Sequence, residues 1–396
     1  MTEEQKRILA LAKEYREKVV ETFVLKDEYS LTDPGQRFSW DSLREASRIG
    51  LRALAISTEY GGANADTVAL CLACEEISYG DLGTAVVLAQ VWKISRALER
   101  VATKQQREKF IGAFMKDPDM VLSIAGTEEV SGGSDVYIPF NHLDHGIKTT
   151  AVLSGSEWIL NGKKVFISNA SEAKLYLVLA RTDTKKPPYE GASMFIVPRD
   201  TPGLSIGEIY DKIGERRANN AEIIFKDSRI PEENLLGKLN GAYDQVMPFF
   251  GESNALAGAT PLGTARRAYD TALEYAKQRV VGGKPIFEHQ AAGVEFAEMR
   301  MKLRAAWDLV LEAAWAFGNQ KPYDPSLAWM AKVFASDVSF EICRRSLEFF
   351  GCRGTFRGSR SEKCLRDATM FLHSDNSALA LKIKTWNYLR GMMYST

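Results

Sequence analysis

The sequence predicts an α+β protein in which a domain of short strands lies between two helical domains. Apolar residues recur at spacings of three and four positions before residue 121 and again after residue 237, as they do in amphipathic helices. Short runs of β-branched and aromatic residues, separated by turn residues, fill the stretch between. The 396 residues are enough for two or three domains with ample buried core. Helices, then strands, then helices are typical of α+β chains.

The N-terminal domain, residues 1–121, is expected to be helical. Apolar positions at helical spacing occur around Ile8, around Leu43 and from Val68 to Ile77. The first residues form a charged amphipathic segment and do not have the apolar core of a signal peptide. No apolar run reaches the roughly 20 residues that a membrane-spanning helix needs. We therefore expect a cytoplasmic protein that makes no membrane contact.

The central domain, residues 122–236, is expected to consist of strands and turns. Asn161-Gly162 separates two alternating segments, and both residue types tolerate a positive φ, so we predict a tight hairpin turn there. A second strand would then cover Lys164–Asn169. The expected strands are Val121–Ile124, Thr149–Leu153, Glu157–Leu160, Val165–Ile167, Leu175–Ala180, Ser193–Val197, Leu204–Ile209 and Glu222–Phe225.

The C-terminal domain, residues 237–396, is expected to be helical again. Long amphipathic segments cover Pro261–Arg279 and Phe287–Gly318, and a shorter one covers Ala378–Tyr388. We find no internal repeat and no low-complexity segment in the chain.

Composition and charge argue against several classes of protein. Lys+Arg and Asp+Glu each total 51, so there is no global field to attract nucleic acid or an anionic membrane. Five cysteines, an odd number, do not describe a disulfide framework. Cys71 and Cys74 form a C-x-x-C, but their apolar surroundings are typical of a buried helix. With four histidines and no histidine cluster, we expect no metal site.

Several motifs together resemble the acyl-CoA dehydrogenase family over essentially the whole chain. Phe166-Ile167-Ser168 is similar to the part of the family's β-domain that packs against the flavin ring of FAD, although an ordinary hairpin would show the same pattern. The resemblance implies a barrel-like central β-domain and a C-terminal four-helix bundle. Further similar segments are Ala125–Asp135, which lacks the family's proline and carries one extra residue, Tyr210–Arg216, Ile230–Gly237, Leu347–Phe356 and Leu365–Ala368.

The resemblance implies an FAD cofactor. Arg279 would pair with the FAD pyrophosphate, although a solvated charge at a helix end is the alternative. Gln290 would reach the FAD of a neighbouring subunit. Glu348 and Cys352 replace a glutamine and a glycine of the family pattern. The expected cofactor-binding residues are Ile124, Gly126, Thr127, Phe166, Ile167, Ser168, Arg279, Gln290, Glu348, Gly351, Cys352 and Ser377.

The resemblance also implies a catalytic base. Acyl-CoA dehydrogenation removes the α-proton of a thioester, and the family commonly supplies a glutamate nine residues after the arginine of its Arg-Asp motif. Counting from Arg366 gives Asp375, a carboxylate one methylene shorter. The alternative is that Asp375 caps the helix Ala378–Tyr388, because Asp is a favoured N-cap residue. An N-cap would be ionised and hydrogen bonded, which conflicts with a base of raised pKa.

An aspartate at this position resembles two offshoots of the family, dehydrogenases of cyclic acyl-CoA substrates and nitroalkane oxidases. Nitroalkane oxidases pair their aspartate with a basic residue seven positions on, which is Lys382 here, and with a serine that corresponds to Ser253. Asn254 replaces the usual dehydrogenase arginine, whereas Ser134 matches the family's CoA-contacting serine. The expected substrate-binding residues are Ser134, Ser253, Asn254, Asn376 and Lys382.

Three functions follow from these residues. The leading one is an FAD-dependent acyl-CoA dehydrogenase with Asp375 as base, acting on a cyclic or branched acyl group. The resemblance implies an electron-transfer flavoprotein as electron acceptor and a homotetramer. The second is a nitroalkane-oxidase-like flavin oxidase, in which oxygen reoxidises the flavin. The third is a catalytically silent family member that serves as a binding scaffold.

Overall fold

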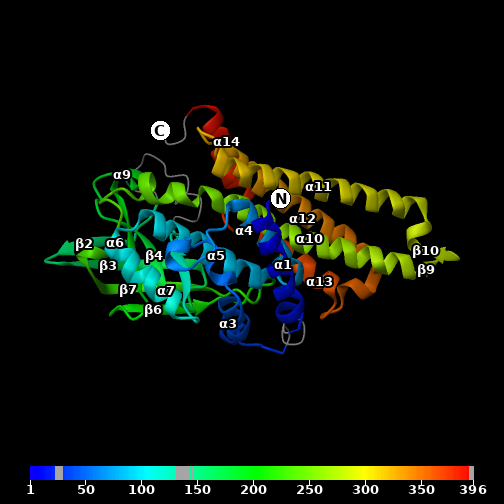
Figure 1. Ribbon diagram of the computed structural model, residues 1–396, viewed down its shortest axis with the longest axis horizontal. Coiled ribbons are helices and arrows are strands. Elements are labelled where there is room, and N and C mark those ends of the chain that lie inside the picture. The colour runs from blue at the N-terminus through cyan, green and yellow to red at the C-terminus, as the bar shows by residue number, and fades with distance from the viewer. Residues whose placement is uncertain (23–29, 131–142, 144–145, 392–396) are drawn as a thin grey trace.

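A computed structural model describes residues 1–22, 30–130, 143 and 146–391 (Figure 1). The chain forms N-terminal helices, a β-sheet and a C-terminal helical bundle, in the order that the sequence predicts. The sheet lies at one end of the molecule, and the long C-terminal helices extend away from it (Figure 1). Within these ranges, we find no helix that is both long enough and apolar enough to cross a bilayer.

Side-chain caps mark the starts of several N-terminal helices. Thr2 and Gln5 form a reciprocal capping box on the first helix, and Asp81 accepts a hydrogen bond from the Thr84 backbone N at 2.8 Å. The helices are α1 (Glu3–Tyr15), α3 (Trp40–Arg48), α4 (Thr67–Gly80), α5 (Leu82–Val101), α6 (Lys104–Gln106) and α7 (Gly112–Lys116).

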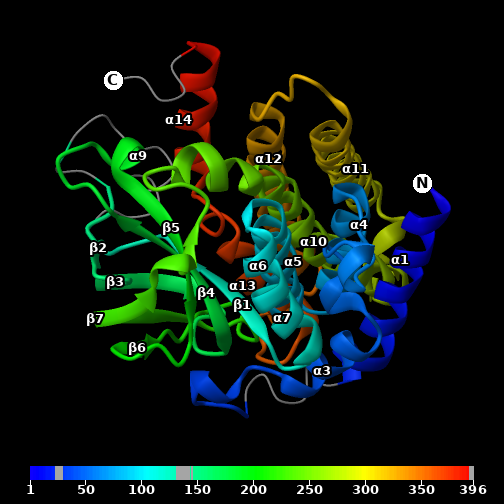
Figure 2. The same cartoon turned by 60° about the vertical axis from the view of Figure 1, so that its left-hand side comes forward.

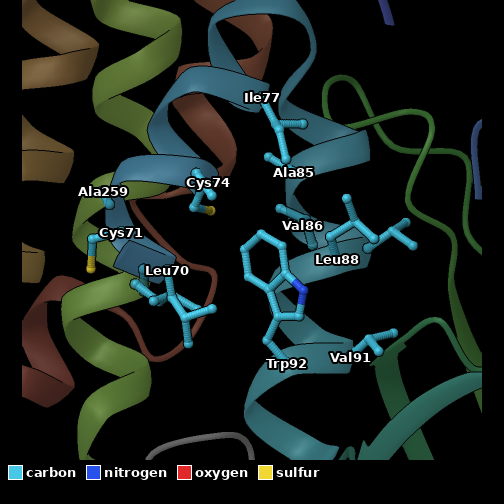
Figure 3. Close-up of a cluster of buried hydrophobic side chains, with 14 of the residues drawn as sticks. Leu70, Cys71, Cys74, Ile77, Ala85, Val86, Leu88, Val91, Trp92 and Ala259 are labelled. Carbon is cyan, nitrogen blue, oxygen red and sulfur yellow. The ribbon is translucent and has the colours of Figure 1, made fainter. Parts of the chain in front are cut away.

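Helices α4 and α5 form the centre of the core. Leu70, Cys71 and Cys74 of α4 are buried near Trp92 of α5 (Figure 3). The indole Nε1 of Trp92 donates to Leu51 O at 2.7 Å, so its polar atom is satisfied. Burial raises the pKa of the Cys74 thiol to about 12, so this C-x-x-C packs as part of a buried helix.

An eight-stranded sheet forms the central domain. Its strands run in the order β6-β7-β3-β2-β4-β5-β8, and β1 pairs parallel with β4. Helix α5 lies between this sheet and helices α4 and α10 (Figure 2). The strands are β1 (Val121–Ala125), β2 (Thr150–Ser154), β3 (Glu157–Ser168), β4 (Ala173–Arg181), β5 (Ala192–Pro198), β6 (Leu204–Ile209), β7 (Asn220–Pro231) and β8 (Leu235–Leu236), with the short helix α9 (Pro188–Gly191) between β4 and β5.

The predicted hairpin at Asn161-Gly162 is wrong. Strand β3 continues through both residues and pairs with β7 along most of its length. The β2–β3 turn falls instead at Gly155, whose φ is 64°. Gly162 lies at an irregularity in the β3–β7 pairing with φ of 148°, and a Cβ there would be 2.4 Å from Thr149 Oγ1. The glycine therefore permits a close strand approach rather than a turn.

The C-terminal helices pack into a bundle in which α10 is central. Helix α10 contacts α12, α11 and α13, and also α4 of the N-terminal domain. A Cβ at Gly263 would be 2.0 Å from Glu75 O, so glycine lets the backbones of α10 and α4 approach closely. The elements are α10 (Ser253–Gln278), β9 (Val280–Val281), β10 (Lys284–Pro285), α11 (Gln290–Asn319), α12 (Ser326–Glu348), α13 (Arg360–Met370) and α14 (Ala378–Leu389).

The predicted start of the first C-terminal helix at Pro261 is also wrong. Helix α10 begins at Ser253, eight residues earlier, and contains Pro261 in its interior. An interior proline lacks an N–H and costs a helix about 3 kcal/mol. Packing offsets this cost here, because the residues from Ser253 to Ala265 are all buried. A sequence pattern gives no measure of that packing.

A buried ionic cluster joins helix α13 to the other two parts of the molecule. Lys363 Nζ lies 2.8 Å from Asp81 Oδ1 at the start of α5 and also pairs with Asp367. Asp367 Oδ1 in turn accepts the backbone N of Glu215 at 2.8 Å. The segment between β6 and β7 is therefore fixed to α13, close to the cavity described next.

Candidate active site

A cavity of about 680 Å³ lies where the sheet, helix α5 and the segment after α13 meet. Its size suits a flat ring system and part of a second small molecule, since ligand sites span about 300–1,000 Å³. The residues that line it are Val86, Gln90, Lys93, Ile124, Gly126, Thr127, Phe166, Ile167, Ser168, Tyr210, Lys212, Ile213, Glu215, Asn220, Thr369, Met370, Phe371, His373, Ser374, Asp375, Asn376 and Ser377.

Phe166 forms an aromatic part of the wall. The pairing of β3 with β7 is irregular between Lys164 and Ile167, and Phe166 has a φ of 59°. A positive φ is a genuine outlier for a bulky residue and often marks a functional site. Asn220 Nδ2 donates to Phe166 O at 2.9 Å and stabilises this conformation. The ring is 58% exposed, and its centroid lies 5.0 Å from that of Tyr210.

Gly126 and Thr127 line the cavity beside β3, and a buried ion pair holds them. Lys164 Nζ donates to Gly126 O at 3.0 Å and to Glu128 at 2.7 Å. Burial opposes ionisation of Glu128, but the Lys164 ammonium and the backbone amides of Lys148 and Thr149 outweigh it and lower the Glu128 pKa. Val165 N also donates to Thr127 O at 3.0 Å. The backbone beside the cavity is thus rigidly placed.

Asp375 lies in the turn between α13 and α14. Asp375 and Asn376 have φ values of 50° and 79°, both in the left-handed region. The Asp375 carboxylate, part of the cavity lining, accepts a bond from Lys93 Nζ at 2.7 Å. Lys332 donates to Phe371 O at 2.7 Å and to Asn376 O at 2.8 Å. Two lysines from two different helices therefore hold this turn.

The alternative that Asp375 caps the last helix is wrong. The N-cap of α14 is Ser377, whose hydroxyl accepts the Ala380 backbone N at 3.2 Å. The Ser377 hydroxyl still has a proton that it can donate toward the cavity. Asp375 is left with Lys93 as its ionic partner and is not part of the helix cap.

The cavity brings together nine of the residues expected from the sequence. They come from three separate parts of the chain, which supports the idea that they act together. They are Ile124, Gly126, Thr127, Phe166, Ile167, Ser168, Asp375, Asn376 and Ser377.

Five expected cofactor-binding residues lie elsewhere, at the end of the bundle that is remote from the sheet (Figure 1). The ring of Tyr275, near the end of α10, contacts the ring of Phe350 at a tilt, with centroids 4.6 Å apart, which brings the ends of α10 and α12 together. None of these five expected residues lines the cavity of its own chain. These residues are Arg279, Gln290, Glu348, Gly351 and Cys352.

The expected substrate-binding residues are dispersed. Ser253 and Asn254 are buried at the start of α10 and do not line the cavity. Lys382 is not the cationic partner of Asp375, because its side chain is 61% exposed and lies 3.9 Å from Asp337. Lys382 lies on an exposed face of α14. The seven-residue spacing from Asp375 does not by itself reveal which face of the helix that residue occupies. Ser134 lies outside the described residues.

The sequence did not single out several polar cavity residues, of which Lys93 is the most informative. Lys93 follows the apolar run around Val91-Trp92, and a charge inside a buried helix face is a usable signal. Glu215 is also buried in the wall. Burial raises its pKa, and Asp367 and Asp375 add to the effect, whereas Lys212 opposes it. Gln90 and Asn220 are further polar residues of the lining that the sequence did not single out.

Comparison with known proteins agrees with this fold. Profiles of the acyl-CoA dehydrogenase N-terminal, middle and C-terminal domains match residues 2–117, 123–228 and 242–372. A probable acyl-CoA dehydrogenase of Bacillus subtilis is 30% identical over 371 residues, which is 93% of both chains.

Solved structures share the fold over nearly the whole chain. Butyryl-CoA dehydrogenase from Megasphaera elsdenii is 28% identical, with a TM-score of 0.90 over 98% of this chain and 99% of that one. A structure from a study of the electron transferring flavoprotein of Acidaminococcus fermentans is 31% identical, with a TM-score of 0.89 over 98% of both chains.

Fold and similarity together define a flavin-dependent oxidoreductase of helical, β and helical domains. The chain belongs to the acyl-CoA dehydrogenase family. That family carries out flavin-dependent dehydrogenation of acyl-CoA.

The cavity residues fit a flavin. Phe166 offers an aromatic surface, and the rigid backbone at Gly126 and Thr127 offers peptide groups for a heterocyclic ring. Asn376 Oδ1 is buried and has no hydrogen-bond partner among the residues that the structure describes. An orphaned buried acceptor beside a cavity calls for a donor from a ligand or a water.

Proposed function

We propose that this protein is an FAD-dependent acyl-CoA dehydrogenase in which Asp375 removes the α-proton of the acyl group. The observation that carries the proposal is that the Asp375 carboxylate and the Phe166 ring line one cavity. Oxidation of a C–H bond beside a flavin needs a base and a wall for the flavin ring that face the same cavity.

Each side chain has a distinct part in this proposal. Phe166 and Ser168, together with Gly126 and Thr127, would hold the flavin ring of FAD. FAD, when bound, supplies the acceptor for the two electrons and the hydrogen lost from the β-carbon. Asp375 would accept the α-proton on its carboxylate, and closure of the cavity around the thioester would exclude water from the proton transfer.

The proposal extends to a cyclic or branched acyl group. Asp375 is one methylene shorter than the glutamate expected in this family, so its carboxylate leaves more space for a bulky group at the α-carbon. The test is anaerobic mixing of the protein with butyryl-CoA, isobutyryl-CoA and cyclohexanecarboxyl-CoA. Faster flavin bleaching by cyclohexanecarboxyl-CoA or isobutyryl-CoA than by butyryl-CoA is expected, and the reverse order would contradict the extension.

Replacing Asp375 by Asn tests the base directly. Asn has nearly the same shape but cannot accept a proton, so Asp375→Asn should retain FAD and bind the acyl-CoA. The rate of flavin bleaching should fall by about 10²–10⁴-fold, the usual contribution of a positioned base. Stopped-flow absorbance of the flavin measures this rate. Bleaching at the parent rate would show that another group removes the proton.

A second candidate function is a flavin oxidase that resembles nitroalkane oxidases. The observation in its favour is the cation paired with the aspartate, although the cation is Lys93 of α5 and not Lys382. Oxygen consumption with nitroethane, in the absence of any other electron acceptor, would favour this function. Bleaching by an acyl-CoA without oxygen consumption would favour the dehydrogenase.

The remaining parts of the proposal concern partners. An electron-transfer flavoprotein would reoxidise the protein, as the similarity to the Acidaminococcus fermentans structure suggests.

Arg279, Gln290 and Gly351 lie outside the cavity of their own chain, so a neighbouring subunit would have to bring such residues to an FAD. We therefore propose a homotetramer. A sedimentation experiment that finds a monomer with bound FAD would contradict it.

A further inference from the structure

Lys93 is a buried cation in a cavity wall that is otherwise uncharged along helix α5. Val86, Gln90 and Lys93 follow at spacings of four and three, so they share the face of α5 that meets the cavity. The Lys93 side chain is 6% exposed, and its Nζ lies 2.7 Å from Asp375 Oδ1. A carboxylate that pairs with a buried ammonium stabilises it.

The ion pair fixes the side chain of Asp375, whereas Lys332 fixes the backbone around it. The left-handed conformations of Asp375 and Asn376 are unfavourable for residues with a Cβ, so this turn needs external support. Lys332 supplies it through the carbonyls of Phe371 and Asn376. Lys93 then selects one orientation of the carboxylate, with Oδ1 held and Oδ2 left for another contact.

We propose that Lys93 is a positioning residue for the base, and this inference rests on the assignment of Asp375 as that base. The substrate C–H bond breaks, an O–H bond forms on Asp375 Oδ2, and the electron pair of the C–H bond stays with the substrate. Lys93 takes no part in the proton transfer and acts only through the orientation of the Asp375 carboxylate.

A purely structural role for Lys93 makes different predictions. If Lys93 only attached α5 to the Asp375 turn, its removal would weaken folding and ligand binding together. A positioning role predicts that the half-saturating substrate concentration changes little, while the rate of C–H cleavage falls. It also predicts that Arg, which keeps a charge at this position, restores much of the rate.

The experiment compares Lys93→Met, Lys93→Arg and the parent by anaerobic flavin bleaching. The probe is whichever of butyryl-CoA, isobutyryl-CoA, cyclohexanecarboxyl-CoA and nitroethane bleaches the parent fastest. Lys93→Met should bleach about 100-fold more slowly, since small misplacements of a reacting group cost rates of that order. Lys116→Met, at an exposed position of α7, is the matched control and should equal the parent.

Urea unfolding provides a measurement that needs neither substrate nor turnover. Lys93→Met should lower the unfolding midpoint, because it leaves the Asp375 carboxylate without its ionic partner. The double variant Lys93→Met with Asp375→Asn should unfold at a higher urea concentration than Lys93→Met alone. Additive losses in the double variant would show that the two side chains are not coupled and would overturn the proposal.

The outcomes separate this inference from the proposed function. If Asp375→Asn bleaches at the parent rate, the base assignment fails, and the role of Lys93 fails with it. If Asp375→Asn loses bleaching while Lys93→Met keeps the parent rate, only the inference about Lys93 is wrong. Loss of bleaching in Lys93→Met without recovery in Lys93→Arg, together with a raised half-saturating concentration, would favour the structural role.

Discussion

At the residue scale, three consecutive residues of the turn after α13 have three different tasks. Asp375 turns its carboxylate to the cavity and to Lys93, Asn376 offers its carbonyl to Lys332, and Ser377 begins α14. The sequence Ser-Asp-Asn-Ser allowed either Asp or Ser to cap the helix. The backbone conformation makes Ser377 the N-cap residue and leaves Asp375 outside the helix cap.

The titration of Lys332 gives a prediction at this scale. Burial lowers its pKa from 10.5 to about 8, although Asp375 and Asp337 oppose the effect. Between these two values the unfolded chain holds a proton at Lys332 that the folded chain has lost. Since the unfolded state binds more protons, the contribution of Lys332 to the free energy of unfolding rises with pH across this window, by about 1.4 kcal/mol per unit.

Comparison with Lys332→Met isolates this titration. The free energy of unfolding of the parent, minus that of the variant, should increase as the pH rises from 8 towards 10.5. Below pH 8 the difference should be constant, because Lys332 is then charged in both states. Urea unfolding at a series of pH values measures it. A difference that stays flat across the window would mean that Lys332 keeps an ordinary pKa.

At the scale of elements, strand β3 both supports the cavity and forms part of its wall. Its first half pairs with β2 and β7, and Gly162 allows Thr149 to approach. Its second half turns Lys164 into the protein and Phe166 toward the cavity, because the irregular pairing between them changes the alternation of faces. Without that irregularity the strand would not present Phe166 as it does.

Gly162→Ala tests the close approach at β3. A Cβ would lie 2.4 Å from Thr149 Oγ1, so the two strands must move apart. Overpacking of this kind costs about 1–3 kcal/mol in the free energy of unfolding. Gly112→Ala in α7 is a suitable control, since its φ is −59° and a Cβ there meets nothing within 4 Å. That change should be neutral or stabilising by up to about 1 kcal/mol.

At the scale of the whole molecule, the cavity exists because three parts of the chain are joined around it. Lys363 of α13 pairs with Asp81 of α5 and with Asp367, and Asp367 holds the segment that carries Glu215. Arg366 Nη1 also donates to Ile213 O at 2.6 Å. The cavity walls thus come from parts of the chain that are remote in sequence. If this cluster were broken, these parts would no longer be held together around the cavity.

Lys363→Met should therefore destabilise the whole molecule. It removes the cation between two buried carboxylates, and removal of one partner from a buried pair costs about 3–5 kcal/mol. We expect a lower unfolding midpoint in urea and weaker retention of FAD after gel filtration. Addition of Asp367→Asn to this variant should restore part of the stability, because it removes one of the two buried carboxylates that lost the Lys363 cation. A variant as stable as the parent would show that the cluster contributes no net stability.

The sequence by itself determined the order of helical, β and helical regions and nine of the residues that line the cavity. The order of regions rests on hydrophobic period, whereas the nine residues rest on the resemblance of short motifs to a known family. Both signals depend on neighbours in the chain. It misjudged Asn161-Gly162 and Pro261, where local preference favours a turn and a helix start but packing against Thr149 and α4 prevails. Tertiary structure alone decided that Lys93, and not Lys382, pairs with Asp375. Ionic pairing depends on distance in space, and residues 93 and 375 become neighbours only when α5 packs beside the turn after α13.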